Sequence, residues 1–459
     1  MAPRICFIGG GSYQWTPKLI LDIADTPSLS EAEIVIEDID PKPIPEMVEL
    51  IQHIATIRGT GMTATGTTNQ TEALAGADYV IVCISTGALT SMEHDLTIPQ
   101  RFGIYQSVGD TIGPGGIMRA LRNIPVMVDI AADMQRVCPD AWLLNLTNPM
   151  TTLTRAVHKA TNITALGLCH EVVLAKYTLS LLLGCDMRDI DAEIAGVNHL
   201  PFITRLRIGE HDGFELLHDL FDDVSRHETQ IAAYGLSARK PASSGFNSAG
   251  DTTVGSLLGA NALKFELFKR FGVLPAAGDR HVAEFFSGFL TQESGWGMRW
   301  GIELTSMENR RAWLAYYEGE AKKMRQAATI PREPSGEMVA TIIDARSRDK
   351  TRHLPLNIAN HGQVPDLPDG VVVESMVTVD ASGLSGRDVA ALPAPVAETV
   401  RRISAEQELV VQAGIAGNRD LAIAAMRLDP LCSRLDYDEL HRMADEMFTA
   451  TAEWLPQFS

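Results

Sequence analysis

The sequence predicts an α/β protein in which an N-terminal Rossmann-like, doubly wound sheet is followed by a C-terminal mixed α+β domain. Short apolar runs alternate with helical stretches over the first 200 residues, which is typical of a parallel sheet covered by helices. The first run, residues 4–8, leads into Gly9-Gly10-Gly11-Ser12 and then a helical stretch, as in the opening unit of a nucleotide-binding sheet. We therefore expect one domain over residues 1–200 and a second over residues 201–459.

Six segments are predicted as buried strands, because each is a short apolar run bounded by polar or turn-forming residues. They are residues 4–8, 33–37, 78–84, 141–146, 163–168 and 193–197. Helices are expected over residues 17–25 and 45–58. From residue 201 the pattern predicts mixed helix and strand, with a mobile loop at residues 240–251. From about residue 388 to the end, Ala-rich amphipathic spacing predicts helices.

The charge and hydropathy of the chain exclude two kinds of partner. The net charge is −19, which disfavours nonspecific binding to nucleic acid or to an anionic membrane surface. No apolar run is long enough for a membrane span, and the chain enters a strand too early for a signal peptide. The even count of six cysteines allows disulfides, but Cys6 and Cys83 lie in apolar runs, so free thiols are expected. These observations predict a cytoplasmic protein.

Gly9, Gly10, Gly11 and Ser12 form a candidate phosphate-binding turn. Glycines at the end of a strand let the backbone approach a pyrophosphate, and the next helix supplies N–H donors. Asp38 closes the second strand, where a ribose hydroxyl binds in such sheets. The spacing from the glycines to Asp38 is longer than usual, and Gln14 replaces the third glycine. A tight turn without a ligand is therefore the alternative.

Two further motifs are candidates for a ligand site. Asn148 comes after the fourth strand, at the edge where parallel sheets bind ligands. The alternative is that Asn148 caps a helix whose first residue is Pro149. The run Gly113-Pro114-Gly115-Gly116 is either a flexible turn or a backbone wall that opens the next helix.

Cys169 and His199 are candidate metal ligands, because each follows a predicted strand and a thiolate with an imidazole suits a borderline divalent metal. Two protein ligands leave coordination positions open for a substrate. The alternative is a buried cysteine and a hydrogen-bonded histidine. Asp279 and Arg280 lie in another ionisable cluster, for which the alternative is a helix cap and an ion pair.

The order of these motifs resembles the NAD- and metal-dependent glycosidases of glycoside hydrolase family four. The resemblance runs from residue 9 to about residue 374. It rests on GGGS at 9–12, DID at 38–40, GPGG at 113–116, TNP at 147–149, CHE at 169–171, GVNH at 196–199, AAGDRHVAEF at 276–285 and the stretch 357–374. This family is an exception to hydrolysis by paired carboxylates. The resemblance implies that the sugar is transiently oxidised at C3, so that NAD is required but not consumed.

The resemblance also implies which residues hold the cofactors. The glycine turn and Ser12 would bind the NAD diphosphate, and Asp38 the adenosine ribose. Cys169 and His199 would hold a divalent metal, expected to be manganese. Residues 1–200 would then be the NAD-binding domain, and residues 201–459 would carry substrate, metal and oligomer contacts of a homo-oligomer.

Catalytic and substrate-binding residues are implied in the same way. His170 takes the place of the acid, an Asp in other members, and Asp279 matches the base position. Asn148 would bind sugar hydroxyls. The Cys-His-Glu-Val form, completed by Glu171 and Val172, resembles the uronate-active α-galacturonidases and implies substrate binding by Glu171 without a 6-phosphate requirement.

A sugar carboxylate needs a local cation, because the acidic chain repels it at long range. Arg119 and Arg280 are the candidates. Three kinds of function remain as alternatives to a galacturonidase. They are an α-glucosidase, α-glucuronidase or α-galactosidase of the same family, a malate- or lactate-type NAD dehydrogenase, and a non-catalytic NAD-binding protein.

Overall fold

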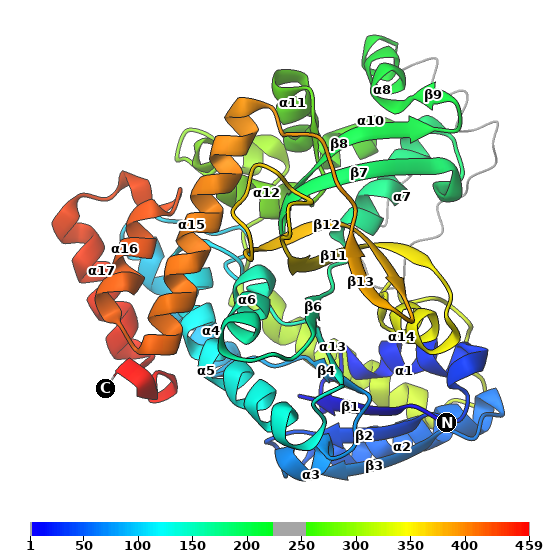
Figure 1. Cartoon of the computed structure of the whole chain (residues 1–459). Coiled ribbons are helices and arrows are strands. Elements are labelled where there is room, and N and C mark those ends of the chain that lie inside the picture. The colour runs from blue at the N-terminus through cyan, green and yellow to red at the C-terminus, as the bar shows by residue number, and fades with distance from the viewer. Residues whose placement is uncertain (1, 224–253, 459) are drawn as a thin grey trace.

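The computed structural model describes residues 2–223 and 254–458, so the loop expected at 240–251 lies outside the described residues. In this part of the chain, one continuous sheet of thirteen strands runs through the molecule, with helices packed around it (Figure 1). Its main path has the order β10-β8-β7-β12-β11-β6-β5-β4-β1-β2-β3. The α/β class expected from the sequence is confirmed.

Half of this sheet is parallel and has the Rossmann strand order 3-2-1-4-5-6. Its strands are β1 (Arg4–Ile8), β2 (Glu33–Glu37), β3 (Thr63–Thr67), β4 (Tyr79–Val82), β5 (Trp142–Asn145) and β6 (Ala165–Gly167). Five of the six were expected. The missed strand, β3, is largely exposed and reads TATGT, so it lacks the apolar run by which the others were found.

Side chains alternate across this half of the sheet, as the pleat of a strand requires. In β1, Ile5 and Phe7 pack into the cluster formed with α1, α2 and α14, whereas Cys6 and Ile8 pack against α5 and α6. Both faces are therefore buried, which explains why these strands read as continuous apolar runs.

The other half of the sheet is antiparallel. Its strands on the main path are β7 (Ile190–Val197), β8 (Leu200–Ile208), β10 (Leu274–Pro275), β11 (Arg352–Ala359) and β12 (Val372–Asp380), while β9 (His211–Asp212) pairs with β8 and β13 (Gly383–Gly386) with β12. The expectation that β7 belongs to the parallel sheet was wrong. Only two residues, Asn198 and His199, join β7 to β8, and so short a connection permits only antiparallel pairing.

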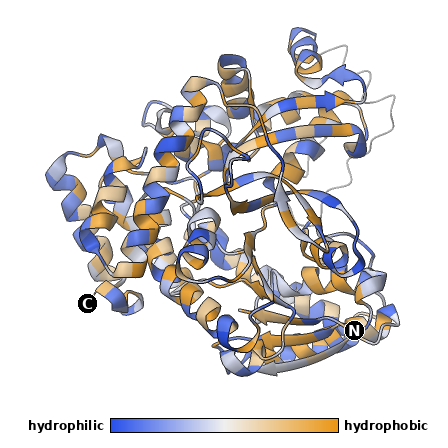
Figure 2. Cartoon of the chain, viewed as in Figure 1, coloured by the Kyte–Doolittle hydropathy of each residue, from blue (hydrophilic) through white to orange (hydrophobic). Residues whose placement is uncertain are grey.

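The helices cover both faces and close one end of the molecule. They are α1 (Thr16–Asp25), α2 (Pro43–Arg58), α3 (Gln70–Leu74), α4 (Ala88–Arg101), α5 (Gly113–Val137), α6 (Met150–Ala160), α7 (Glu171–Leu183), α8 (Gly213–Asp222), α10 (Val254–Ala260), α11 (Ala262–Phe271), α12 (Asp279–Phe285), α13 (Met307–Gln326), α14 (Val339–Arg348), α15 (Ala394–Ala416), α16 (Arg419–Leu428) and α17 (Tyr437–Ala450). The helical C-terminal region is confirmed. Its helices carry hydrophobic and hydrophilic residues side by side, as amphipathic packing requires (Figure 2).

Two further expectations concern the chemistry of the chain. All six cysteines are free thiols, as predicted. Among the described helices, none combines the length and apolarity that crossing a membrane requires.

Candidate active site

The turn after β1 has a geometry that only glycine accommodates. Gly9 has φ of +75°, and a Cβ there would lie 2.2 Å from the carbonyl oxygen of Cys83. A Cβ on Gly11 would lie 2.4 Å from Pro43 Cγ and 2.7 Å from Asp38 Oδ2. The backbone N–H of Gly11 donates to that same Asp38 oxygen at 3.0 Å. The structure thus places Asp38 directly beside the glycines, although the sequence separates them by more than twenty residues.

Ser12 connects this turn to the helix that follows. Its Oγ accepts a hydrogen bond from the backbone N–H of Trp15 at 3.2 Å, and α1 begins at Thr16. The turn therefore leads to a helix N-terminus, the arrangement that favours anionic groups such as a diphosphate. The residues Gly9, Gly10, Gly11, Ser12 and Asp38 form one local unit that fits a dinucleotide.

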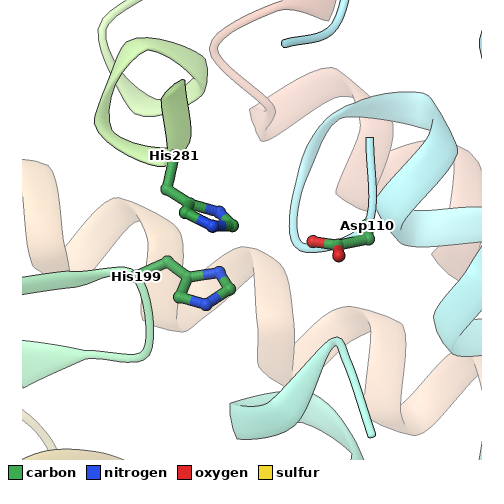
Figure 3. A group of neighbouring side chains, drawn as sticks. All are labelled: Asp110, His199 and His281. Carbon is green, nitrogen blue, oxygen red and sulfur yellow. The ribbon is translucent and has the colours of Figure 1, made fainter. Parts of the chain in front are cut away.

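Three side chains converge at the centre of the structure. Asp110, His199 and His281 each bring a possible ligand atom into one group, in which these atoms lie within 4.8 Å of one another. Figure 3 shows the two imidazole rings lying against each other, with the Asp110 carboxylate facing them from a separate segment. Two imidazoles and one carboxylate are a suitable donor set for a divalent metal such as Mn²⁺.

Thr111 fixes the orientation and tautomer of His199. The Thr111 hydroxyl donates to Asp110 Oδ1 at 2.8 Å, so its oxygen accepts from Nδ1–H of His199 at 2.7 Å. Nε2 of His199 then carries the lone pair. Burial and the neighbouring His281 hold the pKa of His199 at about 3, so the ring is neutral and able to bind a metal.

Asp110 is held ionised by its surroundings. Burial opposes ionisation, but His281, His199 and Arg119 outweigh it and bring the pKa of Asp110 well below its usual range. The side-chain amide of Asn148 donates to Asp110 Oδ2 at 3.4 Å. Asn148 does not cap α6, whose N-cap residue is Pro149, so the helix-cap alternative is not what the structure shows.

His170 and Glu171 border this group. Glu171 Oε1 lies 3.9 Å from Nε2 of both His170 and His281, and its Oε2 accepts from the backbone N–H of Gly278 at 2.5 Å. Burial disfavours the charge, but these histidines and the hydrogen bond lower the pKa of Glu171 to about 2. Nδ1 of His170 lies 3.3 Å from Glu337 Oε1; burial opposes protonation, yet this carboxylate gives a net rise in the pKa of His170.

Cys169 is buried at the end of β6, outside the three-ligand group defined above. Burial, with the carboxylates of Glu374 and Glu171, raises the pKa of its thiol well above the usual value, and Asn198 hydrogen-bonds it. Asn198 directly precedes His199, so its hydrogen bond connects Cys169 to the group of Asp110, His199 and His281. Its role as a metal ligand stays a prediction.

The structure gives the side chains of Asp279 and Arg280 partners other than those considered from the sequence. The Asp279 carboxylate accepts from the backbone N–H groups of Leu263 (2.8 Å) and Lys264 (3.1 Å), at the start of α11 rather than of its own helix. Arg280 donates to the carbonyl oxygens of Ser107 and Glu303 and to the Thr305 hydroxyl. Asp279 as base and Arg280 as a carboxylate ligand remain predictions, and both carry structural hydrogen bonds as well.

The glycine run at 113–116 forms the first turn of α5, where all three of its N–H groups have partners; that of Gly116 donates to the carbonyl oxygen of Ile112. Gly113 donates to Asp429 Oδ2 at 2.7 Å and Gly115 to Gln106 Oε1 at 3.0 Å. Arg119, in the next turn, donates to the carbonyl oxygen of Asn148 and to Ser85 Oγ. The run thus positions Arg119 and Asp110 on either side of the helix start.

Sequence reasoning missed Asp110 and His281. Asp110 lies in a loop with no strand or helix pattern, three residues before the glycine run. His281 is part of the motif at 276–285, from which the sequence predicted roles for its neighbours Asp279 and Arg280 only. A signal for Asp110 was available only in its closeness to the glycine run.

The fold and this site define a class of protein. The model for the family 4 glycosyl hydrolases matches residues 4–185, and that for the C-terminal domain of the same family matches residues 194–432. The chain belongs to family 4 of the glycosyl hydrolases.

Individual relatives give the resemblance more detail. An α-galacturonidase of Thermoanaerobacterium saccharolyticum is 33% identical, over 98% of this chain and 96% of its own. The crystal structure of a Bacillus subtilis protein to which glucosidase activity has been ascribed is 30% identical, with a TM-score of 0.83, and covers 97% of this chain and 99% of its own. A 6-phospho-α-glucosidase from gut microorganisms, solved with NAD and Mn²⁺, is 18% identical with a TM-score of 0.77 over the full length of both chains and shows the shared fold.

Proposed function

We propose that this chain is an α-galacturonidase that uses NAD and Mn²⁺. The observation that carries the proposal is the grouping of Asp110, His199 and His281 in a chain whose first strand ends in a dinucleotide-binding turn. This combination of sites suits an oxidative glycosidase better than a dehydrogenase of the malate or lactate type, which needs no metal. Membership of a hydrolase family also disfavours the dehydrogenase and the non-catalytic alternatives.

The residues present fit both cofactors. When bound, NAD supplies a reversible hydride acceptor and the divalent cation a Lewis acid for sugar oxygens. Asp110, His199 and His281 are the residues of this chain that would hold the cation, with Cys169 as a further candidate. The glycine turn and Asp38 would hold the dinucleotide. The 6-phospho-α-glucosidase of the same fold supports this choice of cofactors.

The remaining residues would orient the sugar and move protons. Among the described atoms, Oδ1 of Asn148 is buried without a hydrogen-bond partner, so it is free to accept from a sugar hydroxyl. His170 is the proposed acid, because the hydrogen bond and charge of Glu337 outweigh burial and raise its pKa, which favours its protonated form. Asp279, whose pKa burial raises to about 6, is kept as the proposed base.

The proposed sugar is a galacturonide, supported by the Cys-His-Glu-Val sequence at 169–172 and by the α-galacturonidase relative. The competing substrates are the neutral α-galactosides, the neutral α-glucosides and the acidic α-glucuronides. The division at residue 200, a homo-oligomeric state and a cytoplasmic location stay predictions.

The experiment that tests the function is hydrolysis of p-nitrophenyl α-galacturonide, α-galactoside, α-glucoside and α-glucuronide. Each substrate is assayed with and without NAD, Mn²⁺ and a reductant. We expect the galacturonide to have the highest kcat/KM, with no net formation of NADH. Equal hydrolysis by protein freed of NAD would contradict the proposed mechanism, and preference for a neutral sugar would contradict the proposed substrate.

A further inference from the structure

Arg119 and Arg310 are electrostatic neighbours of Asp110, and Arg280 is a neighbour of Arg310. Two of these three arginines already have hydrogen-bond partners in the chain. Arg119 donates to Asn148 and Ser85, and Arg280 donates to two backbone carbonyls and a hydroxyl. These bonds hold the segments around the site in place. The same bonds occupy N–H groups that a substrate carboxylate would otherwise use.

The third arginine, Arg310, is different. It lies in the first turn of α13, is only partly exposed, and has Asp110, Arg280 and Glu284 as its electrostatic neighbours. Within the described residues its guanidinium makes no hydrogen bond and no ion pair; its contact is with the ring of Trp313, at 5.7 Å from the ring centroid. A guanidinium held partly out of water without a counter-ion is suited to bind an anion.

Asp110 does not supply that anion. Its two carboxylate oxygens take hydrogen bonds from Thr111 and Asn148, and no ion pair joins it to an arginine among the described residues. Glu284 makes no ion pair with Arg310 among the described residues either; its Oε1 accepts from the backbone N–H groups of Val108 and Gly109, while its Oε2 is buried without a hydrogen-bond partner. The charge of Arg310 therefore remains available to a ligand in contact with the Asp110 group.

We propose that Arg310 is the residue that binds the C6 carboxylate of the sugar and so sets the preference for uronic acids. This inference rests on the proposed function. The planar guanidinium matches a carboxylate in two parallel hydrogen bonds, which a neutral C6 hydroxymethyl group cannot reproduce. It also replaces the sequence-based candidates Arg119 and Arg280 in that role.

The test compares matched p-nitrophenyl α-galacturonide and α-galactoside substrates with wild type, Arg310→Met and Arg310→Lys. Arg311→Met is the control, because Arg311 is the neighbouring exposed arginine and pairs with Glu93 on α4. We expect Arg310→Met to lower the ratio of kcat/KM values, galacturonide over galactoside, by about ten- to a hundredfold, mainly through KM. Arg310→Lys should recover part of the ratio, and Arg311→Met should not change it.

A second readout measures binding without turnover. D-galacturonate should raise the Tm of the wild-type and Arg311→Met proteins, and this shift should be lost in Arg310→Met. If wild type prefers galacturonide and Arg310→Met keeps both the ratio and the Tm shift, the inference is wrong while the proposed function stands. If wild type shows no preference for galacturonide, the proposed function itself fails and the inference fails with it. An equal loss on both substrates would assign Arg310 to positioning Asp110 and would also overturn the inference.

Discussion

The imidazole rings of His199 and His281 lie 3.7 Å apart between centroids, with their planes inclined by 34°. One ring comes from the two-residue turn between β7 and β8, where His199 has φ of +63°, and the other from the first turn of α12. Burial lowers the pKa of both histidines, so two neutral rings lie against each other in a tilted arrangement beside the ionised Asp110. A left-handed conformation in a non-glycine residue is costly and is found preferentially at functional sites.

The first prediction concerns Asp110. Asp110→Asn keeps the shape of the side chain but removes its charge, so we expect the affinity for Mn²⁺ to fall by at least about tenfold. NAD binding should stay close to wild type, because Asp38 and the glycine turn are unchanged. Mn²⁺ titration followed by electron paramagnetic resonance checks the first statement, and NADH fluorescence the second. Asp140→Asn, at an exposed aspartate, is the control. Unchanged Mn²⁺ affinity in Asp110→Asn would remove Asp110 from the metal site.

The second prediction concerns Cys169. If the thiolate is a metal ligand, Cys169→Ser abolishes metal-dependent hydrolysis and leaves NAD binding nearly intact. Burial and the neighbouring carboxylates raise the pKa of the thiol, so a bound cation is what would make the thiolate available. The absorbance of the Co²⁺-substituted protein gives an independent check, since a Co²⁺–thiolate charge-transfer band should be present in wild type and absent in the variant. Wild-type activity in Cys169→Ser would show that Cys169 only fills the core.

The parallel half of the sheet could be predicted because its signals are local. Five of its six strands are short apolar runs and every strand is followed by a helix, so these elements can be recognised without reference to distant residues; β3 lacks such a run and was missed. The antiparallel half depends on long-range pairing. Glu374 of β12 pairs with Gly196 of β7, and no local pattern in either strand identifies the other.

The same difference separates the site residues. Asp38 and Asn148 were found because polar residues at the ends of parallel strands lie at one edge of a sheet. Asp110, His281 and Arg310 come from a loop, a helix start and a long exposed helix, which only the folded chain brings together. The sequence also predicted His199 and Cys169 as the two metal ligands, whereas the structure groups the imidazole ring of His199 with Asp110 and His281.

The third prediction concerns Asp38. Asp38→Ala removes the carboxylate that we propose accepts from the ribose hydroxyls, so the affinity for NAD should fall by roughly ten- to a hundredfold. The loss for NADP should be smaller, because the carboxylate repels a 2′-phosphate. Dissociation constants from NADH and NADPH fluorescence test both statements. Asp40→Ala, two residues away and exposed, should change neither constant. An equal change for the two dinucleotides would mean that Asp38 only shapes the glycine turn.

The fourth prediction concerns Glu284, which is fully buried beneath the Asp110 loop. Burial raises its pKa from 4.5 to about 8. The folded state therefore holds the proton more tightly than the unfolded state, and the stabilisation is present below pH 4.5 and lost as the pH rises through about 8. Glu284→Gln removes this loss. Its free energy of unfolding relative to that of wild type should therefore increase between about pH 5 and about pH 9, by up to a few kcal/mol at about 1.4 kcal/mol per pKa unit, and the difference in Tm should rise with it. Glu453→Gln, at an exposed glutamate, should show no such trend. A constant difference in Tm would show that Glu284 does not titrate in this range.

The last prediction tests His170 as the acid through two of its charged neighbours, Glu337 and Lys18. Glu337 Oε1 lies 3.3 Å from Nδ1 of His170 and 3.1 Å from Nζ of Lys18. Burial lowers the pKa of His170, the Glu337 carboxylate raises it with a net upward shift, and the ammonium group of Lys18 lowers it.

An acid is active only while protonated, so the alkaline limb of kcat/KM against pH follows the pKa of that acid in the free enzyme. Glu337→Gln should therefore move this limb to lower pH, and Lys18→Met should move it to higher pH. Opposite movements are the useful feature, because damage to the fold would lower activity at every pH without moving the limb. If both variants leave the limb where it is in wild type, the proton comes from another group, and the hydrogen bond between His170 and Glu337 serves only to hold the start of α7 against the loop before α14.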